Sequence, residues 1–202
     1  MISLTQEPEI FVRQRRELGE LFGFETRNKY EILNRNSQLI GYAAEQSKGI
    51  MGFIGRQFLG HWRPFEITLF SPNRQPLYRA NHPFRWIFKR MELIDHTGRM
   101  IGAVQQRFAF IYKRFEIQAP DGRVLFTMSS APWKLWTFPF ERDGRQVGLL
   151  RKKWAGLFSE AFTDKDNFHV AFGDGALTND DRLLMLISAI FVDLIYFEKK
   201  AE

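Results

Sequence analysis

The sequence of 202 residues contains no cysteine. This absence excludes disulfide bonds, thiolate metal sites and palmitoylation. Common catalytic motifs are also missing, since the chain has no G-x-S-x-G, P-loop, H-E-x-x-H or G-x-G-x-x-G pattern. The histidines are too scattered for a zinc pattern and stand at His61, His82, His96 and His169. We therefore expect a protein that is not an enzyme of conventional kind and requires no cofactor.

The N-terminal region also lacks an apolar run of the length found in signal peptides. Acidic residues stand instead at Glu7 and Glu9. We therefore expect a cytoplasmic protein, placed at the inner face of a membrane if it associates with one.

Aromatic and basic residues are abundant. The chain has 21 Phe and 5 Trp, which favour strands and fill wide apolar cores. Its length suits one domain, residues 1–202, which can bury about 70% of the unfolded surface. A total of 29 basic against 23 acidic residues gives a net charge of +6. This surplus indicates either an anionic partner, such as a lipid headgroup or a nucleic acid, or simply a basic soluble surface.

Turn signals recur through the middle of the chain. Residues 95–99, 121–123 and 143–145 each contain Asp, Gly and Arg, and residues 34–38 and 71–75 are weaker signals of the same kind. Between them lie segments of alternating apolar residues, namely 65–70, 91–94, 100–106, 115–118, 124–128, 146–150 and 168–172. Their regular spacing predicts an antiparallel meander that closes into a β-barrel. The glycine-rich residues 49–60 are predicted to form a loop.

One long helix is predicted at the C-terminus, over about residues 180–198. Thr178 and Asp181 match a capping box, and the run 183–197 is apolar apart from Ser188, Asp193 and Tyr196. A helix that is apolar on every side is buried in protein or in lipid. The run of roughly 22 Å is shorter than a hydrocarbon core of about 30 Å, and Asp193 would add about 2.5–3.5 kcal/mol to the cost of insertion. The pattern therefore favours a helix enclosed by its own protein.

Several segments, in a fixed order along the chain, resemble the phospholipid scramblase family. The most specific is K-x-W-x-G at 152–156, followed by E-A-F-T-D-x-D-N-F-x-x-x-F at 160–172. The resemblance covers roughly residues 10–198. The other matching segments are Gly23-Phe24-Glu25-Thr26-x-Asn28-Lys29-Tyr30-Glu31-Ile32, Tyr42-x-Ala44-Glu45, Arg63-Pro64-Phe65, Gly102-x-Val104-Gln105-Gln106 and Phe191-x-Asp193-x-x-Tyr196-Phe197-Glu198.

This resemblance implies a fold and two alternative functions. The fold is the tubby-like one, a closed antiparallel barrel of about 12 strands around a hydrophobic C-terminal helix. The first function is a scramblase-like protein that associates with anionic phospholipid at a membrane surface and moves phospholipid between leaflets. The alternative is a soluble tubby-like module that binds a lipid headgroup, a nucleic acid or a protein without moving lipid. Translocation needs a polar path across the bilayer, which an enclosed helix does not provide, so binding is the more physical role.

A calcium site is also implied by the resemblance. The family's proposed calcium loop begins at the position of Asp164 and includes Asp166, with Asp174 near its acidic last position. Oxygen side chains at this spacing can hold Ca²⁺, but Asp and Asn are typical of a solvated hairpin turn, which the spacing alone favours. Position six of the segment is His169 instead of glycine, which is incompatible with EF-hand geometry. A strand over 168–172 would separate the ligands, so we expect weak, millimolar binding at most.

Two basic clusters are candidates for binding anionic lipid. Basic residues interleaved with large aromatic residues suit a membrane interface, and they suit equally a strand with one solvated and one buried face. The family carries lipidated cysteines near residues 84–90, and this chain has none. The candidate residues are Arg13, Arg15 and Arg16 in the first cluster and Arg85, Trp86, Lys89 and Arg90 in the second.

Overall fold

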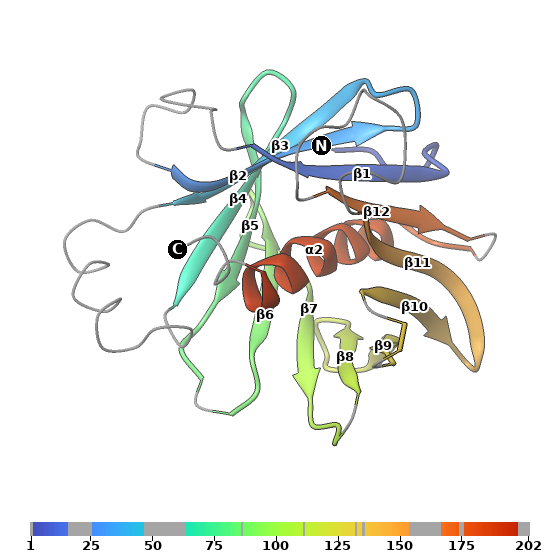
Figure 1. The fold of residues 1–202 in the computed structure, drawn as a ribbon. Helices are drawn as coiled ribbons and strands as arrows, with labels where there is room; N and C mark the ends of the chain where they lie inside the picture. Colours follow the sequence, from blue (N-terminus) through green and yellow to red (C-terminus); the bar gives the residue numbers. More distant parts are fainter. Residues whose placement is uncertain are drawn as a thin grey trace.

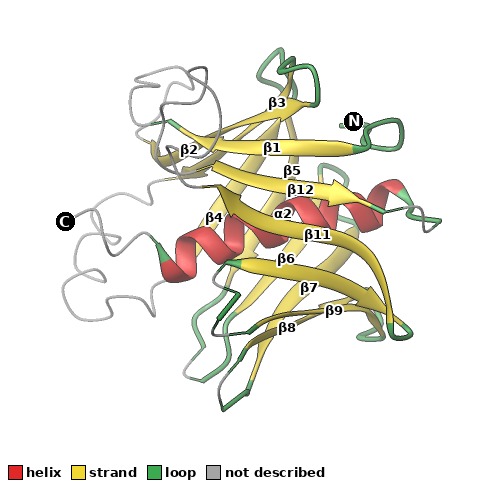
Figure 2. Ribbon diagram, turned by 45° about the vertical axis from the view of Figure 1, so that its right-hand side comes forward, coloured by secondary structure: helices red, strands yellow, loops and turns green. Residues whose placement is uncertain are grey.

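The barrel is formed by twelve antiparallel strands, each hydrogen-bonded to the next in sequence, with β12 returning to β1 (Figure 1, Figure 2). The computed structural model describes residues 2–15, 26–46, 64–85, 87–110, 112–131, 133–134, 136–153, 167–173 and 176–197. Helix α2 runs through the barrel in both views. The predicted closed barrel around a C-terminal helix is confirmed. The predicted loop at 49–60 lies outside the described residues.

Several strands alternate in burial as the sequence pattern predicts, although residues 67–70 and 101–105 are buried without alternation. In β6 the buried residues are Met91, Leu93 and Asp95, and in β9 they include Phe126 and Met128, so one face of each strand points inward. The elements are β1 Glu9–Gln14, β2 Thr26–Asn34, β3 Leu39–Gln46, β4 Phe65–Phe70, β5 Pro76–His82, β6 Arg90–Asp95, β7 Met100–Arg107, β8 Lys113–Gln118, β9 Val124–Ser130, β10 Thr137–Arg142, β11 Arg145–Lys153, β12 Asn167–Phe172 and α2 Asn179–Tyr196.

Tight hairpins connect the strands where the turn signals predict them. Gly98, Gly122 and Gly144 have φ values of 90°, 86° and 74°, which only glycine adopts without strain. In the β6–β7 turn, Asp95 Oδ1 accepts hydrogen bonds from the backbone N–H and the hydroxyl of Thr97. The Thr97 hydroxyl is the largest of the contributions that lower the pKa of Asp95 to about 2. Local side-chain chemistry therefore fixes the register of these hairpins.

Helix α2 begins and ends close to the predicted residues. Its N-cap is Thr178, whose hydroxyl accepts from the backbone N–H of Asp181, while the Asp181 carboxylate accepts from the N–H of Thr178. Residues 183–194 are all buried. No helix in the described ranges is both long and apolar enough to cross a membrane. The apolar surface of α2 is instead covered by the barrel.

Glycines let the helix approach the barrel wall closely at two strands. The helix backbone is closest to β7 and β12. A Cβ on Gly102 in β7 would collide with Gln118 O and with a Leu184 methyl, and one on Gly148 in β11 would collide with Met185 Cε. Large rings, all buried, fill the space between the helix and strands β8 to β10, namely Phe115, Phe126, Phe138 and Phe140. The high phenylalanine content thus has a packing role.

Each polar side chain in the apolar run of the helix has a partner. The Ser188 hydroxyl donates to Leu184 O at 2.8 Å, as is common within helices. The Tyr30 hydroxyl in β2 donates to Asp193 Oδ2 at 2.8 Å, with both side chains almost fully buried. Asp193 Oδ2 therefore has a hydroxyl partner from the barrel wall. This hydrogen bond fixes the helix to the barrel wall.

We predict that Tyr30→Phe lowers the free energy of unfolding by about 1–3 kcal/mol, because it removes a donor from a buried carboxylate. Asp193→Asn should cost less than Asp193→Leu, since the amide keeps an acceptor for Tyr30. Chemical denaturation of the four proteins measures both differences. The opposite order of Asn and Leu would show that the contact contributes little.

Candidate functional site

The two ends of the barrel differ in chemistry. An antiparallel meander places all connections that follow odd-numbered strands at one end, here called the loop end, and the other connections at the opposite turn end. The hairpins of the turn end contain no Phe, Tyr, Trp, Leu, Ile, Val or Met; they are residues 34–38, 71–75, 95–99, 120–123 and 143–144. At the loop end, the connections are longer and rich in aromatic residues. The C-terminus of α2 also lies at the loop end.

Three neighbouring connections of the loop end carry positive charge only. These are the β5–β6, β7–β8 and β9–β10 loops with their flanking residues, 83–89, 107–114 and 131–136. Together they contain six basic and no acidic residues. The basic residues are Arg85, Lys89, Arg107, Lys113, Arg114 and Lys134. Arg107 is paired with Glu116 in β8 at 2.8 Å, and the other five basic residues make these three loops a cationic surface.

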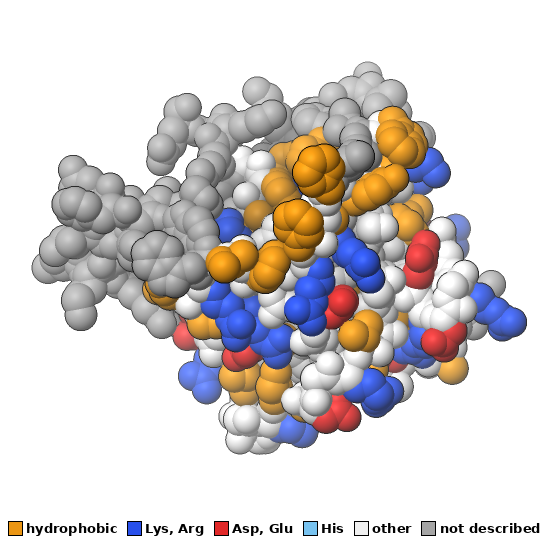
Figure 3. All heavy atoms as spheres, turned by 90° about the horizontal axis from the view of Figure 1, so that it is seen from below, with side chains coloured by type: hydrophobic (Ala, Val, Ile, Leu, Met, Phe, Trp, Pro, Cys, Tyr) orange, Lys and Arg blue, Asp and Glu red, His pale blue; other side chains and the backbone are white. Residues whose placement is uncertain are grey.

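Large hydrophobic side chains stand exposed on the same three loops. In the part of the chain that the structure describes, seven such side chains are exposed and six lie here. We call these six the apolar rim: Phe84, Ile87, Phe108, Phe110, Tyr112 and Trp133. The β5–β6 and β7–β8 loops point downward in Figure 1, and the view from below shows hydrophobic side chains gathered beside Lys and Arg (Figure 3). Apolar and cationic groups thus share one surface.

Contacts between neighbours hold the three loops together. The Tyr112 and Trp133 rings meet edge to face with centroids 6.3 Å apart, joining the second loop to the third. The backbone N–H of Gln106 donates to Lys89 O at 2.8 Å, joining the first loop to β7. The rim is therefore a continuous surface.

The C-terminal end of helix α2 contacts residues that flank these loops. Lys113 Nζ lies 4.3 Å from the centroid of a Trp136 ring and 5.4 Å from that of Tyr196. Lys152, itself buried, places Nζ 3.2 Å from the Phe197 ring centroid. The last turn of the helix has no basic residue of its own, so these ammonium groups complement the negative end of the helix dipole. Burial raises the pKa of the Tyr196 phenol.

The predicted lipid-binding residues all belong to the loop end by sequence position, but their environments differ. Arg85 is exposed and Lys89 partly exposed, as a binding surface requires. Arg90 begins β6, where Nε lies 2.7 Å from Glu92 Oε1 and a terminal nitrogen donates to Gln118 Oε1 at 2.7 Å. Neutralising Arg90 would thus disturb the barrel wall itself.

Two arginines of the first predicted cluster also form ion pairs within the barrel wall. Arg13 and Arg15 pair with Glu31 on the adjacent strand at 3.8 and 3.3 Å. Arg13 and Glu31 are direct cross-strand partners. Arg16 and Trp86 lie outside the described residues. Of the seven predicted residues, Arg85 and Lys89 are thus the ones that the structure places on the cationic surface of the three loops.

The predicted calcium ligands Asp164, Asp166 and Asp174 lie outside the described residues. Between them, β12 covers six residues and pairs with β1 on one side and β11 on the other. At about 3.3 Å per residue, such a strand holds its ends roughly 17 Å apart. The described ranges contain no group of three His, Asp or Glu side chains that could hold a metal ion. A loop wrapped around one ion would have to draw ligands from both ends of this strand.

We predict that any Ca²⁺ binding through Asp164 and Asp166 is weak, with a Kd of about 1 mM. Isothermal titration of the wild type and of Asp164→Asn/Asp166→Asn measures it, with Asp121→Asn/Asp143→Asn at the turn end as a charge-matched control. The first double variant should lose the binding heat and the control should keep it. Submicromolar affinity would show a far better site than this sequence predicts.

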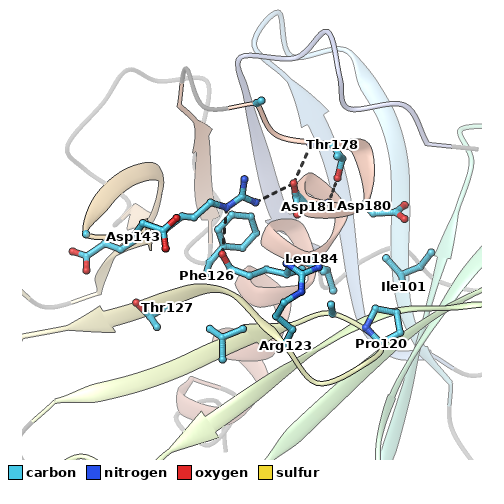
Figure 4. A pocket seen from close by; sticks show the side chains of 17 residues that line it. Ile101, Pro120, Arg123, Phe126, Thr127, Asp143, Thr178, Asp180, Asp181 and Leu184 are labelled. Atoms are coloured by element: carbon cyan, nitrogen blue, oxygen red, sulfur yellow. Dashed lines mark hydrogen bonds and ion pairs between the residues drawn. The ribbon is translucent and has the colours of Figure 1, made fainter.

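The turn end contains a hollow of about 890 Å³ (Figure 4). It lies between β9 and β10, which pair at only two positions, Met128 with Phe140 and Thr127 with Glu141. Arg142 spans the gap and donates from Nε to Leu125 O at 3.3 Å and from a terminal nitrogen to Asp181 Oδ2 at 3.2 Å. The cation and the carboxylate neutralise each other. Arg142 therefore closes the barrel wall and ties it to the start of α2.

The part of the apolar rim that follows residue 90 was not predicted from the sequence. Phe108, Phe110, Tyr112 and Trp133 were not predicted, because an alternating aromatic pattern is typical of a strand as well as of an exposed loop. A signal was present: residues 107–114 contain no Gly, Pro, Asn or Asp, the residues that normally make a hairpin turn. A connection without turn residues that keeps its aromatic side chains is a candidate for contact with a partner.

Comparison with known proteins gives consistent results. The family model described as Scramblase matches residues 1–199. The chain is 30% identical to phospholipid scramblase 2 of Bos taurus, over 96% of this chain and 70% of that protein, and 30% identical to phospholipid scramblase 1 of Homo sapiens, over 96% and 64%. A phospholipid scramblase family protein of Schizosaccharomyces pombe is 26% identical over 97% of this chain, which spans 61% of that relative's length.

A solved structure supports the fold. An Arabidopsis thaliana protein superimposes with a TM-score of 0.50 over 93% of each chain, at 10% sequence identity. At this identity the likeness concerns the architecture alone.

Proposed function

Because the chain belongs to the Scramblase family, we propose that it is a scramblase-like protein that associates with anionic phospholipid at a membrane surface. The observation that carries the proposal is a set of three neighbouring loops at the loop end, which contain six basic and no acidic residues. One of the six, Arg107, is paired with Glu116, which leaves five. Side chains of Lys and Arg near an anionic leaflet contribute about 1 kcal/mol each. We place the protein at the cytoplasmic face of the membrane, where anionic lipids are concentrated.

The proposal concerns binding and does not include movement of lipid between leaflets. A headgroup that crosses a bilayer needs a polar path, and helix α2, enclosed by the barrel with its polar groups paired, offers none. A lipid-flip assay on the same preparation measures translocation separately from binding. The names of the relatives identify them as phospholipid scramblases, which is the reason to include this assay.

We predict that the protein co-sediments with vesicles containing phosphatidylserine or a phosphoinositide and not with neutral phosphatidylcholine vesicles. Binding should fall steeply with added salt, because the Debye length is about 8 Å at physiological ionic strength. Arg85→Gln/Lys89→Gln should weaken binding about 30-fold, from about 2 kcal/mol of lost attraction. Arg123→Gln/Arg145→Gln removes the same charge at the turn end and should have a much smaller effect.

Both double variants should keep the thermal stability of the wild type, since Arg85, Arg123 and Arg145 are exposed and Lys89 partly exposed. Equal affinity for neutral and anionic vesicles, or none for either, would contradict the membrane function. The soluble binding module for a nucleic acid or a protein would then remain.

A further inference from the structure

The apolar rim has a degree of exposure that folding alone does not explain. Phe110 is 92% exposed, Ile87 76%, Trp133 74% and Phe108 73%. Single exposed apolar residues are normal on a protein surface, but a concentration on three adjacent loops marks an interaction site. The rim lies at one end of the barrel only, with Val124 as the one exposed large hydrophobic side chain elsewhere in the described residues. These four side chains are largely exposed to solvent.

The order of residues along the loops indicates the kind of partner. In 107–114 the sequence is R-F-A-F-I-Y-K-R, so basic residues flank an apolar tip on both sides, with Arg107 paired to Glu116 and Arg114 exposed. A tip of this kind can enter the boundary between headgroups and acyl chains, about 5–10 Å deep, while the flanking cations meet the phosphates. Residues 83–89 repeat the arrangement, with Arg85 and Lys89 beside Ile87.

A bilayer accounts for these features better than a protein partner. Protein interfaces typically bury aromatic anchors in matching pockets and deplete lysine at their core. Here the apolar side chains stand on three separate loops, and Lys89, Lys113 and Lys134 lie among them. The fluid interface of an anionic bilayer can accept separate apolar tips and lysines at once.

We infer that the barrel docks end-on, with the apolar rim inserted into the interfacial layer of an anionic bilayer and the turn end facing away from it. This inference rests on the proposed function and adds the orientation of the barrel on the membrane and the depth to which the rim inserts. The axis of α2 then points toward the membrane with its C-terminus nearest the lipid, since Trp136 and Lys113 connect the loops to Tyr196. The helix itself stays in the barrel.

The absence of native cysteine allows a direct test with single reporters. Ile87→Cys, Phe110→Cys and Trp133→Cys are each labelled with an environment-sensitive dye, as are the turn-end controls Asn36→Cys and Asn73→Cys. Vesicles of phosphatidylcholine and phosphatidylserine carry nitroxide quenchers on their acyl chains. The three rim reporters should shift to the blue and be quenched on binding, and the two controls should not change.

A second measurement tests the contribution of the rings. Phe108→Ser/Phe110→Ser should weaken vesicle binding by about tenfold or more and remove the part of the binding that persists at high salt. Val124→Ser, at the turn end, is the matched control. Circular dichroism should show native sheet in both, because all three side chains are exposed.

The outcomes separate this inference from the proposed function. If the wild type binds anionic vesicles but the rim reporters stay in a polar environment, the protein binds by charge or through another face and end-on insertion is wrong. If the Phe108→Ser/Phe110→Ser variant binds as tightly as the wild type, insertion is also wrong and the rim is left as a surface for a protein. If the wild type does not bind anionic vesicles at all, the proposed function itself fails.

Discussion

A helix that is apolar on every side must be enclosed, and the rest of this structure depends on that constraint. Residues 183–194 of α2 are buried without a polar face. A bundle or an open sheet would leave part of that surface in water, whereas a closed barrel covers all of it. The barrel also leaves no sheet edge available for aggregation. Enclosure of the helix explains both the closed topology and the large number of aromatic residues.

The barrel is filled in two ways, by glycines where the helix lies close to the wall and by large rings elsewhere. Near β7 and β11, Gly102 and Gly148 leave room for Leu184 and Met185. Between these two strands, phenylalanine rings of β8, β9 and β10 complete the core. Side chains fill the interior around α2, and the Arg142–Asp181 ion pair bridges the hollow at the turn end. Function is therefore to be sought at the ends, where loops can vary without disturbing the core.

Some features of this structure were predictable from the sequence and others were not. The barrel, the helix and its Thr178 cap were predictable, because period-two burial, Asp-Gly turns and capping boxes are local signals. The environments of Arg13 and Arg90 were not, because the sequence shows a charge but not the partner across the strands. Register places Glu31 opposite Arg13, which makes the pair part of the wall. The exposure of Phe110 likewise depends on where β7 ends, which a continuous aromatic pattern conceals.

The central claim is that the protein meets a membrane with its loop end while the helix remains the core of the barrel. Hydrogen exchange with and without anionic vesicles tests it most directly. Amides of α2 should remain as protected on vesicles as in solution, and amides of 83–89, 107–114 and 131–136 should gain protection. Faster exchange in α2 on vesicles would show that the helix leaves the barrel, which would contradict the account.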